Sequence, residues 1–321
     1  MSKAKLAIAL TTLSVALVAW AVPIRGIAQQ RLRSSLKPSQ PDKSQSVLSA
    51  KSVAPIRLRE RDRGLLVTAW LNDAGPFTFA VDTGAGVSLI SRDVVTRARL
   101  QVSKSRRPLV GGLSTTPIAS DQEARLTALS LGTPSNRIST KAVAAVVPQL
   151  PGEIDGILDP SEVFSPLGFS VDLPNRELRV FDPNSQSLRG KPVPRDGAVV
   201  RWVREAGNER PFVRLGDGRL ALIDTGSGFG LALNETRRAV GRNHGDFENR
   251  HDLGGGSVQS REVQPQTVNI GALVLRGVPT DVLSGVAPNT PIILGRKALF
   301  PFKLTFDPVA RLIAFEPTER N

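Results

Sequence analysis

Residues 76–84 read Pro-Phe-Thr-Phe-Ala-Val-Asp-Thr-Gly, and residues 218–226 read Gly-Arg-Leu-Ala-Leu-Ile-Asp-Thr-Gly. In both stretches an Asp-Thr-Gly turn directly follows a short apolar run, which predicts a β-strand. One such tripeptide is expected by chance about 0.06 times in a chain of this length. A lone copy would indicate only a turn, because Asp and Gly favour turns. Two copies in the same context indicate a specific role.

The surroundings of the two motifs repeat in the same order. Each motif is preceded by a β-hairpin signal and followed by a glycine-rich segment, an Ile-Leu pair and a closing hairpin. The Ile-Leu pairs are residues 157–158 and 293–294, and the closing hairpins span residues 169–181 and 302–315. This repetition predicts two homologous lobes, residues 55–182 and 198–317, joined by residues 183–197.

The predicted fold class is all-β, with two β-barrel lobes related by a pseudo-two-fold axis. Short apolar runs recur between Gly, Pro, Asn and Asp residues, a spacing typical of barrels and sandwiches. Expected strands include residues 65–71, 77–81, 143–147, 180–181, 220–223, 268–270 and 304–306. Two short helices are expected at residues 92–98 and 235–240, capped by Ser91 and Asn234.

The composition excludes several classes of protein. The 321 residues are 40% apolar and 22% charged, which is ordinary for a globular protein. The absence of cysteine excludes a disulfide scaffold, a cysteine nucleophile and a cysteine zinc site. The two histidines, His244 and His251, lie in a polar stretch without a well-spaced third ligand. We therefore expect no metal and no cofactor.

The net charge of +13 is concentrated near the N-terminus. Residues 1–60 contain ten Lys or Arg and two acidic residues, a net charge of +8, which leaves +5 for the other 261 residues. No RNA- or DNA-binding motif accompanies this basic segment. We therefore expect no nucleic-acid partner.

The first 28 residues are predicted to direct export. Lys3 and Lys5 precede an uncharged, mostly apolar run over residues 6–22, the layout of a secretory signal within residues 1–28. Cleavage after Ala21 or after Ala28 is consistent with it, and an uncleaved membrane anchor through residues 6–22 is the alternative. The body would then be periplasmic or secreted, or held at a membrane.

Residues 29–54 are rich in Ser, Gln, Lys and Pro and predict a flexible linker. The alternative is a propeptide whose cations, Lys37, Lys43 and Lys51, pair with acidic groups of an immature active site.

The paired motifs carry the chemistry. Pseudo-two-fold packing would bring Asp82 and Asp224 together at the junction of the lobes. Two carboxyl groups at such a short distance share one proton, because the ionisation of both would cost repulsion free energy. The ionised member can then take a proton from water while the protonated member polarises a carbonyl, which is general acid–base hydrolysis of an amide.

On both motifs, the glycine-containing segments and Ile293-Leu294-Gly295, the chain resembles the aspartic protease family over residues 60–317. Each lobe is similar to a retropepsin subunit, and the overall organisation is pepsin-like. The resemblance implies that Asp82 and Asp224 are the catalytic dyad, and that Thr83 and Thr225 brace one loop against the other. Supporting positions would be Gly84, Gly226 and Ser227. The flap would be Gly111, Gly112, Leu113, Ser114 and Thr115, with Gly254, Gly255 and Gly256 as its counterpart.

Three features depart from the family pattern. Asp159 stands where the family has glycine after the first Ile-Leu pair, which would alter the loop supporting Asp82. The chain has no tyrosine, so the flap tyrosine of pepsin-like enzymes is absent. Ala85 follows the first motif whereas Ser227 follows the second, so only one lobe has a hydroxyl there.

Two functions follow from this interpretation. The first is an exported aspartic endopeptidase that binds a peptide or protein substrate as an added β-strand. It would act as a monomer, because one chain supplies both aspartates. The alternative is a non-catalytic peptide-binding or scaffolding module that keeps the fold, although such a module has no need of a costly like-charge pair.

Overall fold

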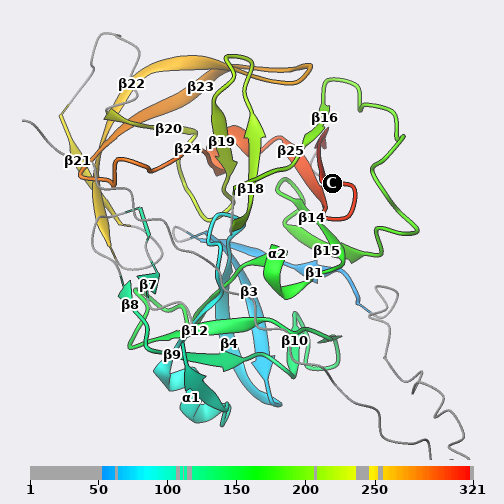
Figure 1. Ribbon diagram of the computed structural model, residues 1–321, viewed down its shortest axis with the longest axis vertical. Helices are drawn as coiled ribbons and strands as arrows, with labels where there is room; N and C mark the ends of the chain where they lie inside the picture. Colours follow the sequence, from blue (N-terminus) through cyan, green and yellow to red (C-terminus); the bar gives the residue numbers. More distant parts are fainter. Residues whose placement is uncertain are drawn as a thin grey trace, which may run out of the picture. The chain divides into compact units, whose positions relative to one another are not determined.

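The computed structural model describes residues 53–61, 64–105, 109–110, 112–113, 118–205, 208–235, 246–251 and 256–318. Val47–Asn321 forms one compact unit built mainly of β-strands (Figure 1). The expected all-β class is therefore confirmed. The predicted signal or anchor and nearly all of the predicted linker lie outside the described residues. Within the described ranges, no helix is long and apolar enough to cross a membrane.

The N-terminal half contains a large curled sheet. Its strands are β2 (Arg59–Arg61), β3 (Gly64–Leu71), β4 (Ala74–Val81), β5 (Leu89–Ser91), β6 (Val102–Lys104), β9 (Gln122–Arg125), β10 (Leu129–Leu131), β11 (Arg137–Ile138), β12 (Val143–Val147) and β13 (Gly156–Leu158). They follow the order β11-β10-β3-β4-β13-β5-β12-β9-β6, with β2 paired to β3. A separate short hairpin joins β7 (Leu109–Val110) to β8 (Ile118–Ala119).

The C-terminal half contains an eight-stranded sheet. Its strands are β17 (Val203–Glu205), β18 (Asn208–Arg214), β19 (Leu220–Ile223), β20 (Leu231–Asn234), β21 (Glu248–His251), β22 (Ser257–Ile270), β23 (Leu273–Ser284) and β24 (Ile292–Leu294). They follow the order β17-β18-β19-β24-β20-β23-β22-β21.

Both sheets use one pairing pattern around the strands that carry the motifs. In the N-terminal half, β13 lies parallel to β4 and antiparallel to β5, and β12 lies parallel to β5. In the C-terminal half, β24 lies parallel to β19 and antiparallel to β20, and β23 lies parallel to β20. The pairing thus follows the duplication seen in the sequence, and it places the ends of β4 and β19 in equivalent positions.

A third sheet is shared by the two halves. It consists of β1 (Ile56–Arg57), β14 (Gly168–Asp172), β15 (Glu177–Phe181), β16 (Ala198–Arg201), β25 (Phe302–Asp307) and β26 (Leu312–Pro317). The order β1-β15-β14-β25-β26-β16 takes three strands from each half, and at its centre Phe169 stacks on Phe306 with ring centroids 4.6 Å apart. Because both closing hairpins join this one sheet, the divisions predicted at residues 182 and 198 stay predictions.

The described helices are single short turns. Helix α1 (Arg92–Arg97) begins after Ser91, whose Oγ accepts a hydrogen bond from the backbone of Val94 at 3.4 Å. The predicted cap is therefore confirmed. Helices α2 (Pro160–Val163) and α3 (Arg296–Leu299) follow β13 and β24. Most of the helix predicted at residues 235–240 lies outside the described residues, and Asn234 ends strand β20.

The long β22–β23 hairpin exceeds the strand expected there, residues 268–270. Most side chains of β22 from Arg261 to Asn269 are polar, so the sequence lacks the apolar alternation that predicts a strand. Pro265 also interrupts the run, and the register with β23 shifts between Val263 and Val268. Proline cannot donate to a ladder of hydrogen bonds, which explains an irregularity at this point.

Candidate active site

Asp82 and Asp224 stand at the ends of the equivalent strands β4 and β19. The backbone N–H of Asp82 donates to the carbonyl of Leu158 at 3.0 Å, and that of Asp224 donates to the carbonyl of Leu294, also at 3.0 Å. Because β13 and β24 run parallel to the motif strands, each aspartate leaves its sheet at the same point. The last residues of both motif strands are buried, which anchors the two loops in the core.

The two threonines join the loops across the junction of the halves. The backbone N–H of Thr83 donates to Thr225 Oγ1 at 3.2 Å, and the backbone N–H of Thr225 donates to Thr83 Oγ1 at 3.1 Å. Each hydroxyl in turn donates to a carbonyl of the opposite half, Thr83 to Ile223 at 2.7 Å and Thr225 to Val81 at 3.2 Å. Both side chains are fully buried. The structure thus gives them the bracing geometry that the sequence predicts.

The motif glycines bring the two carboxyl groups together. A Cβ atom on Gly84 would lie 2.5 Å from the Asp224 carboxyl carbon, and one on Gly226 would lie 2.3 Å from the Asp82 carboxyl carbon. Each carboxyl therefore packs on the glycine of the opposite loop, where any side chain would displace it. Backbone N–H groups hold the carboxylates: Gly84 donates to Asp82 Oδ1 and Ser227 to Asp224 Oδ1, both at 2.8 Å.

The surroundings disfavour two charges on this pair. Burial raises the pKa of Asp82 well above its usual range, and the charge of Asp224 raises it further. Burial also raises the pKa of Asp224, although the backbone N–H of Ser227, a hydrogen bond with Asp82 and the charge of Arg296 oppose this rise. Two such carboxyls share one proton over an intermediate pH range. The arrangement can supply an acid and a base at one place.

This paired geometry agrees with a comparison to known families. Residues 67–159 match the family model for aspartyl protease. The match covers less than half of the chain, and we call it the aspartyl protease segment. It begins within β3, contains the first motif and ends at Asp159. The second motif lies outside it. A search of curated proteins finds no match to this chain.

The threonine pair should control the stability of the aspartyl protease segment's junction with the C-terminal half. We expect Thr225→Val to lower the free energy of unfolding by about 2–4 kcal/mol, because the N–H of Thr83 and the carbonyl of Val81 would lose their partner while buried. Thr225→Ser keeps the hydroxyl and is the control, with an expected loss of about 1 kcal/mol. Denaturant unfolding measures both. Equal losses in the two variants would contradict a role for the hydroxyl.

Arg296 is a site residue that sequence reasoning missed. It is the first residue of α3, and its Nη1 donates to the carbonyls of Thr225 at 3.0 Å and Gly226 at 2.8 Å. The half-buried guanidinium therefore fixes the loop that carries Asp224. Its position directly after Gly295 was the available signal, but the contact joins residues 70 apart and depends on the fold.

Asp159 closes the aspartyl protease segment as a buried helix cap. It is only 1% exposed, and its Oδ1 accepts a hydrogen bond from the backbone of Ser161 at 2.8 Å at the start of α2. Its own backbone N–H donates to Ser88 Oγ at 3.1 Å. Burial raises the pKa of Asp159 to about 7; the Ser161 N–H opposes this rise and the charge of Glu162 adds to it. The residue that replaces the family glycine is thus a buried titratable group, which the sequence alone did not reveal.

The two loops differ at the residue directly after each motif. At Gly295, the counterpart of Asp159, a Cβ atom would lie 2.8 Å from Ser227 Oγ and 2.5 Å from the carbonyl oxygen of Phe229. The first loop has Ala85 where the second has Ser227, so it lacks this hydroxyl. The Ser227 hydroxyl accepts a hydrogen bond from the backbone of Phe229 at 3.3 Å, so its support of Asp224 comes from its backbone.

The predicted flap is described in part. Gly111, Ser114, Thr115, Gly254 and Gly255 lie outside the described residues, whereas Gly112, Leu113 and Gly256 lie within them. Gly112 and Leu113 belong to the connection between β7 and β8, and Gly256 directly precedes β22. Leu113 packs against a cluster of the C-terminal half, composed of Ala232, Val258, Leu283 and Ile293. The β7–β8 connection therefore reaches the opposite half.

Partly buried apolar side chains follow both motifs. Ala85 and Val87 pack against a small cluster of the N-terminal half that includes Leu89 and Ile157. Phe229 and Val286 pack against the same C-terminal cluster as Leu113. The sequence did not single out Val87, Phe229 or Val286, because isolated apolar residues carry no pattern that marks a role.

No group of three potential metal ligands is present in the described ranges. His244 lies outside them, and only the backbone of His251 is described.

Proposed function

We propose that the protein is an aspartic endopeptidase that hydrolyses peptide bonds in extended polypeptides through a water molecule activated between Asp82 and Asp224. The observation that carries this proposal is the contact of each aspartate with the motif glycine of the opposite loop. The match of residues 67–159 to aspartyl protease supports it. A binding module would gain nothing from two buried carboxyls that oppose each other's ionisation.

The proposed reaction needs one proton on the pair. The ionised carboxylate takes a proton from water as the water oxygen attacks the carbonyl carbon, and the protonated carboxyl donates its proton to the carbonyl oxygen. As the C–N bond of the tetrahedral intermediate breaks, the carboxyl that gained the water proton donates it to the leaving nitrogen, and a hydroxyl of the intermediate returns its proton to the other carboxylate. The dyad thus again holds one proton, and no covalent enzyme intermediate forms. The threonine exchange holds both loops in place during these steps.

The apolar side chains beside the two motifs favour apolar residues around the cleaved bond. Ala85 and Val87 pack against a cluster of the N-terminal half, and Phe229 and Val286 pack against a cluster of the C-terminal half. An extended substrate crossing the dyad would place successive side chains next to these two groups.

The proposal includes export, with residues 1–28 as signal or anchor, and action as a monomer on a peptide or protein substrate. Both aspartates belong to one chain, which supports action as a monomer.

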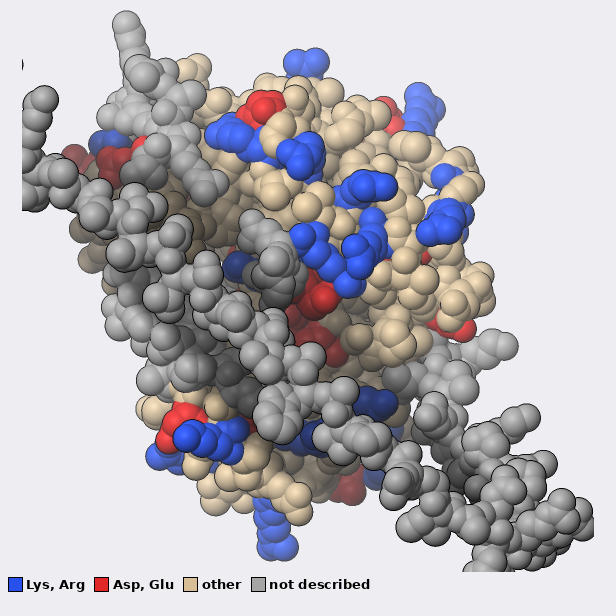
Figure 2. All heavy atoms as spheres, in the orientation of Figure 1, with Lys and Arg blue, Asp and Glu red and all other residues tan. Residues whose placement is uncertain are grey.

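On the face shown in Figure 2, Lys and Arg side chains are interspersed with Asp and Glu, which gives this face a mixed surface charge.

Cleavage of a diverse peptide mixture by the purified full chain tests the proposal. New termini are identified by mass spectrometry between pH 3 and 8, beside the variants Asp82→Asn and Asp224→Asn. We expect cleavage next to apolar residues, and a loss of at least about 1,000-fold in each variant, since either substitution removes the acid or the base. If the folded parent cuts nothing at any pH, the peptide-binding alternative becomes the better account. Undiminished cleavage by either variant would exclude the dyad mechanism.

A further inference from the structure

The dyad is nearly symmetric in its loops but not in the groups behind them. In the C-terminal half, Leu294 is followed by Gly295 and Arg296, whereas in the N-terminal half Leu158 is followed by Asp159 and Pro160. Because β13 and β24 occupy equivalent places, these residues stand at equivalent positions beside the two loops. One loop therefore has a cation next to it and the other a buried carboxyl.

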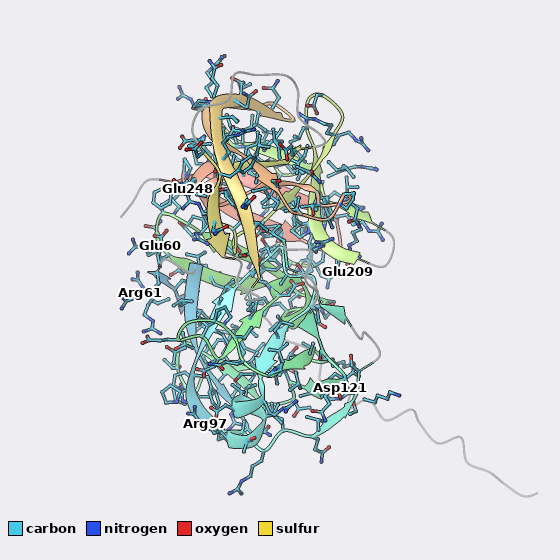
Figure 3. The ribbon with its side chains drawn as sticks, turned by 90° about the vertical axis from the view of Figure 1, so that its left-hand side faces the viewer. Glu60, Arg61, Arg97, Asp121, Glu209 and Glu248 are labelled. Carbon is cyan, nitrogen blue, oxygen red and sulfur yellow. The ribbon has the colours of Figure 1, made fainter. Side chains whose placement is uncertain are left out.

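The polar groups around Asp224 oppose the effect of burial on its ionisation more than those around Asp82 do. Arg296 donates to the two carbonyls that follow Asp224, at 3.0 and 2.8 Å, and an arginine keeps its proton at any physiological pH. The carboxylates that face Arg296 are Asp224, Glu60 and Asp82, and Asp224 interacts with it most strongly. Figure 3 shows Glu60 near the level where the two halves meet. Backbone N–H groups of Gly226 and Ser227 also stabilise the Asp224 carboxylate.

The surroundings of Asp82 favour its protonated form. A single backbone donor, Gly84, contacts it at 2.8 Å. The charge of Asp224 opposes its ionisation, and Asp159 adds to this effect only once it has itself ionised near neutral pH. Asp159 itself lies next to Glu162 of α2, which opposes the ionisation of Asp159 in turn. The N-terminal half thus places acidic groups on the side of Asp82 where the C-terminal half places a guanidinium beside Asp224.

We propose that Asp224 carries the charge of the dyad and Asp82 carries its proton, that Arg296 imposes this division as a positioning residue, and that Asp159 reinforces it once ionised. The catalytic meaning rests on the proposed function: Asp224 takes the proton from water, and Asp82 polarises the substrate carbonyl. Asp159 adds a dependence on pH. Once it ionises near neutral pH, its charge opposes loss of the remaining dyad proton, so the singly protonated pair persists towards neutral pH.

Carboxyl titration of the full chain tests the division without relying on catalysis. The protein is labelled with ¹³C at the aspartate carboxyl carbons, and the two signals are assigned with Asp82→Asn and Asp224→Asn. In the coupled titration, we expect the first ionisation step to move the Asp224 signal more, and the second to move mainly the Asp82 signal. A first step that moves Asp82 more would overturn the proposal.

Variants behind the dyad test the cause. We expect Asp159→Asn to lower the pH of the second ionisation step of the dyad by roughly one pH unit. The alkaline limb of the pH profile of peptide cleavage should shift to lower pH by the same amount. Asp281→Asn is the matched control, since Asp281 is another buried carboxyl with a pKa raised by burial, but it neighbours Lys297, Arg250 and Glu262. Equal effects of the two substitutions would overturn the role of Asp159.

Arg296→Gln should raise the pH at which the first ionisation step of the dyad occurs. Arg296→Lys should leave that pH closer to the value of the parent protein. If Arg296→Gln does not fold, the parent titration and Asp159→Asn still decide the proposal. A parent that titrates as expected but cuts no peptide would contradict the proposed function and leave the order of ionisation standing. If the parent protein cuts peptides but Asp82 ionises before Asp224, the proposed function stands and the proposed division of charge is contradicted.

Discussion

Gly226→Ala is expected to lower peptide cleavage by at least about 100-fold while the protein stays folded. The new Cβ atom would lie 2.3 Å from the Asp82 carboxyl carbon and 2.4 Å from its Oδ2. Ordinary contact needs about 3.4 Å or more, so the carboxyl must move by about 1 Å, and a displacement of that size costs about two orders of magnitude in rate.

Gly228→Ala is the matched control, because it changes the same loop two residues further along. A Cβ atom at this position would meet only Arg296 Nη2, at an ordinary 3.6 Å. We expect near-parental cleavage from it, measured as kcat/KM on a peptide found in the mixture experiment. Gly84→Ala, with its contact of 2.5 Å to Asp224, should behave like Gly226→Ala. Parental activity in both motif variants would show that the active form does not hold the carboxyls against these glycines.

Asp159→Asn is expected to remove the share that Asp159 contributes to the loss of stability between pH 4 and pH 7. The pKa of Asp159 is about 7 in the folded protein, against about 3.9 in an unfolded chain. Between these values the unfolded state releases the proton while the folded state keeps it. Stability contributed by this group is therefore fully present below pH 4, falls as pH rises towards 7 and stays low above it. A difference of about 3 pH units corresponds to about 4 kcal/mol.

The amide that replaces the Asp159 carboxyl would stay neutral at every pH, and its oxygen could still accept from Ser161. Denaturant unfolding at several pH values between 4 and 8 measures the effect. We expect the variant to be more stable than the parent at pH 8 and about equal to it at pH 4. The control is Asp121→Asn, an exposed carboxyl in the N-terminal half (Figure 3), which should leave the pH dependence unchanged. If the stability of Asp159→Asn depends on pH in the same way as that of the parent, Asp159 is not a buried carboxyl that keeps its proton in the folded state.

The residues that the sequence predicts best are those that depend on local pattern. The two Asp-Thr-Gly turns end apolar strands, so their equivalence could be inferred before any coordinates, whereas the pairing of Thr83 with Thr225 followed from the resemblance to the aspartic protease family. Ser91 as a helix cap is local in the same sense. Arg296 could not be assigned, because its contacts with the second loop exist only once β24 lies beside β19. The burial of Asp159 likewise depends on packing around α2.

Other differences have physical causes in the sheets. Most of strand β22 could not be predicted, because its polar residues and Pro265 lack the alternating apolar pattern of a half-buried strand. The shared sheet escaped prediction because a hairpin's sequence does not specify which partner pairs with its outer strand. Strand β14 could have completed a barrel of its own half, but it pairs with β25 of the other.

The covalent joining of the two halves has a consequence for how such a site can change. In a dimer of identical chains, symmetry repeats each substitution on both sides of the axis, so a charge placed behind one aspartate also stands behind the other. Here one chain runs from β15 to β16 between the two halves, and three strands of each half complete one sheet. Each half can then mutate independently while the interface persists. The chain can keep a guanidinium beside one aspartate and a carboxyl beside the other. A homodimer of either half could not have this difference between its two aspartates.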